Sequence, residues 1–279
     1  FGGGGVVYNA PGMSATGYNL ALETSTRHGS VSVGRGDELL ASVELAEQRR
    51  HAVELLPRVD ALAAAHGFGP GDIGQVSVSI GPGSFTGLRV AVTTAKMLAR
   101  ATGAQIVAVP TLDVVAANLA PAPRGEDGRG RTSAMQGPVS ASAFGESAHP
   151  HPSPLPGREG GRPLAVMLNA KGGRCFTGMY DLTDDGWQRR GDAALMTPAE
   201  VVEVMGGAFT VIGDHLPEHD WPDGAAVIED DRARPRSDVV WRIGRAMAQG
   251  GWFTDAYQLT PLYVRLPDAE EKWRAEVGR

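Results

Sequence analysis

A glycine-rich segment is the part of the sequence best suited to bind a charged group. It lies between a strand-like run over 75–80 and a helical pattern that continues to Arg100. Backbone N–H groups can converge in such a turn at a helix N-terminus, where the dipole favours a phosphate or a carboxylate. The alternative, favoured by the residue types alone, is a structural turn whose glycines supply torsion angles and whose Ser84 or Thr86 caps the helix. The segment consists of Gly81, Pro82, Gly83, Ser84, Phe85, Thr86 and Gly87.

Three familiar motifs do not fit this segment. A P-loop needs a Lys-Ser or Lys-Thr pair after its glycines, and none follows here. A hydrolase nucleophile elbow needs glycine two residues before its serine, where Pro82 stands. The dinucleotide fingerprint needs its third glycine where Thr86 stands.

The histidines and the cysteine do not form a metal-binding pattern. His51 is followed four residues later by Leu55, so we expect His51 to be a partly exposed helix residue or a cap. His215 and His219 are four apart, but a proline between them argues against a shared helical face. The single cysteine, Cys175, excludes an internal disulfide and suits a reducing cytoplasm. The residues alone therefore indicate no metal site.

The charge balance argues against a surface that grips nucleic acid unaided. Lys and Arg number 26 and Asp and Glu number 32, which gives a formal charge of −6. Any nucleic acid is therefore expected to be held through a partner. No run approaches the roughly 20 apolar residues of a membrane span, and we expect a cytoplasmic protein.

Two similar halves are visible along the chain. Asn19–Glu23 and Gly29–Val33 predict one strand pair, and Leu164–Asn169 and Arg174–Asp181 predict another. Each pair is followed by helices and short strands, which indicates an α/β fold with two lobes of mixed sheet and packed helices. The expected division is a disordered extension over 1–18 with the natural start at Met13, a lobe over 19–120, a low-complexity insertion over 121–162, a second lobe over 163–265 and a loose tail over 266–279.

Helical periodicity and capping residues locate the main helices. Apolar spacing predicts a helix over 49–66 that either begins near Pro57 or carries a kink there. A second helix is expected from Thr86 or Gly87 to Arg100. Three further helices are expected to be capped by Thr111, Thr197 and Ser237.

These segments, in this order, resemble the TsaB (YeaZ) family. The resemblance covers most of residues 19–273 apart from the insertion, and it implies the duplicated, actin-like ASKHA (ribonuclease H-like) fold. The residues that carry it are LALETSTRHGSVSV, RRHAVELLP, GPGSFTGLRV, IVAVPTLDVVA, LNAKGGRCFTGMYDL and LTPLYVRLPDAEEKW.

The resemblance implies a pseudo-enzyme that supports catalysis by a partner. Family members assist TsaD, together with TsaE, in transferring a threonylcarbamoyl group to adenosine 37 of tRNAs that read codons beginning with A. TsaD-type proteins place two histidines four apart on a helix, where this chain has His51 and Leu55. The expected partners are TsaD and TsaE homologues, with tRNA reached only through the complex. No catalytic, metal-binding or cofactor-binding residue is expected in the chain alone, and a nucleotide is expected, if anywhere, at the partner interface.

A stripe of small residues suggests where a partner binds. Ala91, Ala95 and Ala99 recur at four-residue spacing on a helix with few charged residues, so a second helix could settle closely there. The resemblance implies that the N-terminal-lobe helices pair with TsaD or with a second copy of the chain. We expect Ala95→Glu to abolish pairing and leave the lobe folded. The full set of candidate interface residues is His51, Leu55, Leu56, Leu88, Ala91, Val92, Ala95 and Ala99.

Two enzyme readings remain as alternatives. An ASKHA-type ATP-dependent kinase or ATPase would need phosphate loops in both lobes and acidic residues for magnesium, and Glu23 and the turn over 171–173 are the only traces. A metallopeptidase would need the second histidine that Leu55 replaces.

Overall fold

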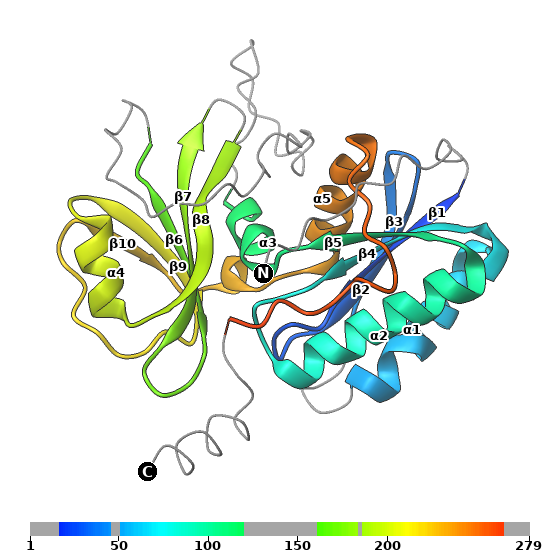
Figure 1. The fold of residues 1–279 in the computed structure, drawn as a ribbon, viewed down its shortest axis with the longest axis horizontal. Helices are drawn as coiled ribbons and strands as arrows, with labels where there is room; N and C mark the ends of the chain where they lie inside the picture. The colour runs from blue at the N-terminus through cyan, green and yellow to red at the C-terminus, as the bar shows by residue number, and fades with distance from the viewer. Residues whose placement is uncertain (1–16, 46–50, 120–160, 184–185, 265–279) are drawn as a thin grey trace.

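Two five-stranded sheets with packed helices make up the molecule (Figure 1). The computed structural model describes residues 17–45, 51–119, 161–183 and 186–264. The predicted extension up to residue 16, the insertion up to residue 160 and the tail lie outside these ranges. Strand β1 already begins at Tyr18, so the last residue of the predicted extension belongs to the first lobe.

The two sheets have the same topology. In the first, β1, β2 and β3 are antiparallel neighbours and β4 and β5 are parallel to β1, in the order β3-β2-β1-β4-β5. In the second, β8-β7-β6-β9-β10 repeats that order and those directions. The predicted duplicated ASKHA-like α/β fold is thereby confirmed. The strands are β1 Tyr18–Glu23, β2 Ser30–Arg35, β3 Glu38–Glu44, β4 Ile73–Ser79, β5 Gln105–Val109, β6 Leu164–Asn169, β7 Cys175–Thr183, β8 Gly186–Met196, β9 Phe209–Asp214 and β10 Ala225–Ile228.

Helices from each half of the sequence cross over to the other half. Helix α5 packs on the first sheet, although the sequence assigns it to the second lobe, and α3 packs on the second sheet, although the sequence assigns it to the first. The predicted boundaries of the two lobes need correction in this respect, because a sheet accepts any helix that covers its apolar face. The α-helices are α1 His51–His66, α2 Phe85–Thr102, α3 Thr111–Ala117, α4 Pro198–Met205 and α5 Ser237–Gln249.

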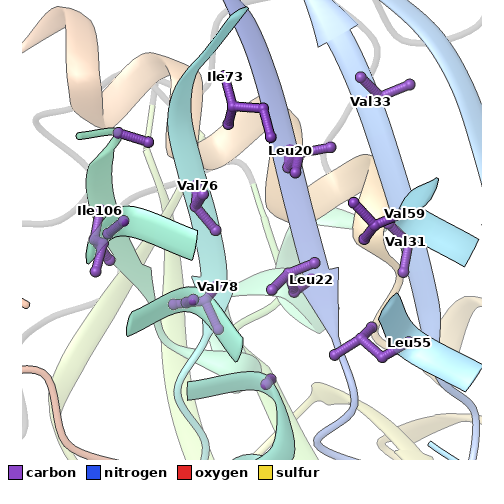
Figure 2. Packing of buried hydrophobic residues seen from close by; sticks show 14 of the residues in the cluster. Leu20, Leu22, Val31, Val33, Leu55, Val59, Ile73, Val76, Val78 and Ile106 are labelled. Atoms are coloured by element: carbon purple, nitrogen blue, oxygen red, sulfur yellow. The ribbon is translucent and has the colours of Figure 1, made fainter. Parts of the chain in front are cut away.

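The core of the first lobe follows the alternation of its strands. Leu20 and Leu22 point toward α1 and α2, and Ala21 points toward α5 on the opposite face. Leu55 and Val59 of α1 reach the same core (Figure 2). Helix α1 continues through Pro57, so the alternative in which it begins near that proline is wrong. Among the described helices, none combines the length and apolarity that a membrane crossing requires.

The third strand of each sheet, β3 and β8, was not predicted. Both lie at sheet edges and are mostly half-buried or exposed, so charged and apolar residues mix along them. Edge strands tolerate such mixtures because they pack on one side only. The predicted strand pairs are therefore three-stranded meanders.

Two of the three predicted helix caps are wrong. Thr197 caps α4 together with Glu200, as expected. The residues at the cap positions of α3 and α5 are Pro110 and Arg236, and neither side chain caps. The fully buried hydroxyls of Thr111 and Ser237 instead bond to the first sheet, because buried polar groups there need partners.

Candidate functional site

The glycine-rich segment packs tightly against the turn between β1 and β2. Ser84 Oγ accepts a hydrogen bond from Gly87 N, so Ser84 caps α2 as predicted. A methyl group on Gly83 or Gly87 would overlap the carbonyl oxygen of Ser25 or Thr24. The hydroxyl of Thr24 donates to the carbonyl of Gly87 at 2.7 Å. The glycines are therefore required by close backbone approach.

Several N–H groups of this segment already have partners within the chain. Ser84 N donates to Ser25 O at 2.6 Å, and Gly81 N donates to Thr111 Oγ1 at 3.0 Å. Gly87 N donates to Ser84 Oγ at 3.3 Å. These groups do not point together at an open anion site, so the geometry favours a structural turn over a phosphate cradle.

Glu23 organises the turn on which this segment packs. It is fully buried at the end of β1, and its Oε1 accepts hydrogen bonds from Ser25 N and Ser25 Oγ, each at 2.5 Å. Burial raises the pKa of Glu23, which favours the neutral carboxyl. Its Oε2 has no hydrogen-bond partner among the described residues. Glu23 thus holds the Ser25 backbone whose carbonyl accepts from Ser84.

The end of the described chain covers the other side of the segment. We call residues 254–264 the C-terminal strap. Leu262 N donates to Ile80 O at 2.7 Å, and the rings of Phe85 and Tyr263 lie 5.0 Å apart. Arg89 places its guanidinium 4.3 Å from the centre of the Phe85 ring. The segment is thus enclosed between the β1–β2 turn and the strap.

His51 is buried, which corrects the expectation of a partly exposed residue or cap. Its side chain is 6% exposed and lies against the start of β2, where a methyl group on Gly29 would be 2.9 Å from Nε2. Burial lowers the pKa of His51, so the folded state favours the neutral imidazole.

We expect His51 to make the protein less stable in mild acid. The unfolded chain takes up a proton near pH 6.5 and the folded chain resists it, so stability falls as the pH drops below 6.5. The loss is at most about 1.4 kcal/mol per pH unit. In urea unfolding at pH 7.5, 6.5 and 5.5, His51→Gln should lose less stability than the wild type. Equal losses in the two proteins would contradict this account.

Most of the predicted interface residues lie in the core of this chain. Ala91 and Ala95 are fully buried, because the small side chains let α2 sit close to the first sheet. The alanine stripe thus packs against the first sheet within the lobe, and the prediction that it faces a partner is wrong. Only Leu56, at 37%, is exposed; the buried candidates are His51, Leu55, Leu88, Ala91, Val92, Ala95 and Ala99.

A different side of the same helices is open to solvent. Val53 is 71% exposed on α1, and Met97 is 52% exposed on α2. Arg89 and Thr93 are exposed on α2 as well. We call Val53, Leu56, Arg89, Thr93 and Met97 the α1–α2 face. Sequence reasoning missed it because periodicity identifies an apolar stripe without showing which side of a helix meets the sheet.

His215 and His219 do not share a helical face, as the proline between them predicts. Residues 215–219 lie outside any helix, and His215 has a left-handed backbone with φ 52°. Over the described ranges, no three His, Cys, Asp or Glu side chains are grouped so as to hold a metal ion.

A buried polar cluster ties α3 to the second sheet and was not predicted. Tyr180 of β7 donates its hydroxyl hydrogen to Asp113 of α3 at 2.7 Å, and Arg189 of β8 lies 3.4 Å from the same carboxylate oxygen. Burial raises the pKa of Asp113, and the Arg189 guanidinium opposes that rise. Across the lobes, Arg27 also pairs with Asp214 at 3.3 Å. These contacts link residues 67 to 187 positions apart, so no local sequence signal could reveal them.

A small cavity lies between the β1–β2 turn and residues 231–236. Its volume is about 150 Å³, and acidic and basic side chains both line it. The two lining arginines, Arg234 and Arg236, are already paired with Asp231 and Asp238. The cavity therefore shows no clear preference for an anion or a cation.

Cys175 is expected to be unreactive in the native protein. Its side chain is fully buried in β7, and burial raises the pKa of the thiol to about 11. At pH 8 only about one thiol in a thousand is then ionised, and the thiolate is the reactive form. With the reagent DTNB we expect negligible labelling of native protein and one equivalent in urea. Full labelling of the native protein within minutes would contradict the burial.

Part of this chain matches known proteins in sequence. A family model for TsaD, tRNA N6-adenosine threonylcarbamoyltransferase, matches residues 38–127. The tRNA threonylcarbamoyladenosine biosynthesis protein TsaB of Bacillus subtilis is 35% identical over 99 residues, which cover 36% of this chain and 43% of that protein. TsaB of Haemophilus influenzae is 38% identical over 97 residues, covering 35% and 40%. The matched region thus spans less than half of each of these relatives.

The fold of both lobes also has a solved counterpart. YeaZ from Pseudomonas aeruginosa superposes with a TM-score of 0.62 at 23% identity, covering 89% of this chain and all of that one. At this identity the match concerns the fold alone. About a third of this chain is therefore similar in sequence to TsaB proteins, and its two lobes share the fold of YeaZ.

Proposed function

We propose that this chain is a non-catalytic subunit in the synthesis of threonylcarbamoyladenosine on tRNA. The observation that carries the proposal is the match of about a third of the chain to proteins named for that biosynthesis. The local geometry is consistent with a supporting role. Leu55 stands one helical turn after His51 and is 1% exposed in the core, so α1 presents no pair of imidazoles.

We propose TsaD and TsaE homologues as the partners of this chain. A TsaD-type transferase from Anaeromyxobacter dehalogenans is 44% identical over 77 residues, covering 27% of this chain and 23% of that enzyme. The proposed contact on this chain is the α1–α2 face, which can also pair two copies of the chain. We propose that the chain holds no cofactor alone and that a nucleotide, where one is used, sits between chain and partner.

Reconstitution with the TsaD and TsaE homologues of the same source tests the function. The measurement is formation of threonylcarbamoyladenosine on tRNA supplied with the activated threonylcarbamoyl donor. We expect at least a tenfold increase when the chain is added and no product from the chain alone. Equal product formation with and without the chain would contradict the proposal.

Met97→Glu is expected to weaken pairing with the TsaD homologue at least tenfold. The variant places a charge on the exposed side of α2, where it is desolvated only when a partner covers it, and tenfold corresponds to about 1.4 kcal/mol. Co-purification and titration measure the effect. Val204→Glu is the matched control, because Val204 is 53% exposed on α4 of the other lobe and Met97 is 52% exposed. Equal pairing by both variants would exclude this face.

A further inference from the structure

An ion pair ties the β1–β2 turn of the first lobe to strand β9 of the second. Arg27 Nη2 donates to Asp214 Oδ1 at 3.3 Å. The two side chains are 33% and 19% exposed, so water reaches both partners. An ion pair with this much exposure contributes little unless other contacts fix its geometry. The contacts around Arg27 and Asp214 therefore determine how firmly the pair holds the lobes together.

His28 fixes the orientation of the Arg27 guanidinium. Arg27 Nε donates to His28 Nε2 at 3.0 Å, so the guanidinium bridges an imidazole and a carboxylate. An imidazole accepts such a bond only when Nε2 carries no proton. The backbone that carries His28 is itself held, because His28 N donates to Thr26 Oγ1 and Thr26 Oγ1 donates to His28 O, each at 3.2 Å. The bridge therefore requires a neutral His28.

The second lobe holds Asp214 in place at the end of β9. The next residue, His215, has a left-handed backbone with φ 52°, and its carbonyl accepts a hydrogen bond from Asn169 Nδ2 at 2.6 Å. His215 Nε2 lies 3.6 Å from Asp214 Oδ1, the oxygen that Arg27 contacts. A protonated His215 would compete with Arg27 for that oxygen. Acid therefore weakens the pair from both of its ends.

Charges of both signs face His28, and burial works against its protonation. Burial lowers the pKa of His28, Arg234 and Arg27 lower it further, and Asp214 and Glu44 oppose them. The folded form thus takes up a proton less readily than a free imidazole, whose pKa is 6.5. The contribution of neutral His28 is fully present above pH 6.5 and is lost as the pH falls below it. The charged residues that face His28 or line the cavity beside it are Arg27, Glu44, Asp214, Asp231, Arg234 and Arg236.

We propose that His28 is a pH-dependent latch between the two lobes. Neutral His28 orients Arg27 toward Asp214 and keeps the lobes closed at this point. When His28 takes up a proton, Nε2 becomes a donor, the new charge repels Arg27, and the ion pair separates. The lobes stay joined through α3, which packs on the second sheet, and α5, which packs on the first, so the β1–β2 turn and β9 move apart as in a hinge.

The distance between two spin labels in the full-length chain tests the latch. Cysteines replace Asp60 on α1 and Glu203 on α4, because both residues are exposed and the two helices lie at opposite ends of the molecule (Figure 1). The native Cys175 is buried and is not labelled. Double electron–electron resonance measures the distance at pH 7.5 and 5.5. We expect the mean distance to lengthen in acid by more than about 2 Å, as in a domain rearrangement.

Substitutions of His28 separate the latch from other effects of acid. His28→Gln should remove the pH response, because the amide oxygen accepts from Arg27 at both pH values. His28→Lys places a permanent charge beside Arg27 and should lengthen the distance already at pH 7.5. His66→Gln is the matched control, because it also removes an imidazole but lies at the last residue of α1, and it should respond as the wild type does.

Three results would each overturn the latch. They are an unchanged distance in the wild type between the two pH values, an equal pH response in His28→Gln, and a wild-type distance in His28→Lys at pH 7.5. Circular dichroism at both pH values separates opening of the lobes from unfolding. If the wild type unfolds at pH 5.5, the comparison of His28→Lys with the wild type at pH 7.5 decides alone.

Discussion

Ala95→Glu is expected to unfold the first lobe. Ala95 is fully buried between α2 and the sheet, and no basic side chain belongs to the cluster around it. An uncompensated buried charge costs at least about 3–5 kcal/mol, and the larger side chain adds strain. This is comparable with the whole stability of a domain, about 5–15 kcal/mol. Circular dichroism and thermal unfolding should show a lost or strongly lowered transition.

The same substitution on the outer side of α2 provides the comparison. Met97 lies two residues away and is 52% exposed, so Met97→Glu should keep a transition close to that of the wild type. The two variants separate loss of folding from loss of pairing. A folded Ala95→Glu protein that fails only to pair would restore the stripe as an interface and contradict its place in the core.

Gly87→Ala is expected to destabilise the protein by about 3 kcal/mol or more. The added methyl group would overlap the carbonyl oxygen of Thr24, a backbone atom that cannot rotate away. Either α2 or the β1–β2 turn must then shift, and overpacking of this kind costs about 1–3 kcal/mol even where side chains can adjust. Urea unfolding followed by tryptophan fluorescence measures the loss.

Gly71→Ala is the matched control for that variant. A methyl group at Gly71 meets no atom within 4 Å, and the residue is exposed. The free energy of unfolding should change by less than about 1 kcal/mol. A small increase is expected, because alanine leaves the unfolded chain fewer conformations than glycine does. If Gly87→Ala were as mild as Gly71→Ala, the close approach between the glycine-rich segment and the turn would be disproved.

Much of the fold could be predicted because its signals are local. The alternation in Leu20, Ala21 and Leu22 and the glycine-rich turn before α2 each depend on neighbouring residues. Strands β3 and β8 were not predicted because edge strands carry only a weak alternation of polar and apolar residues. The predictions that Thr111 and Ser237 cap helices are wrong for a common reason. Each hydroxyl forms a hydrogen bond to a serine of a strand distant in sequence, and such tertiary contacts override the local preference for capping.

The candidate site was predicted less well than the fold. The glycine-rich segment was located correctly, but its packing against Thr24 and Ser25 depends on residues about 60 positions away. The alanine stripe was recognised as a close-packing surface, and only the structure shows that the sheet, not a partner, fills it. Which side of α2 faces inward is decided by the whole lobe.

The exchange of helices between the sheets affects how the protein can fold on the ribosome. One face of the first sheet stays bare until Ser237–Gln249 has been synthesised and has left the exit tunnel. The first sheet therefore cannot complete its packing until α5 has emerged, and its apolar strands must wait for about 140 further residues, from the end of β5 to the end of α5.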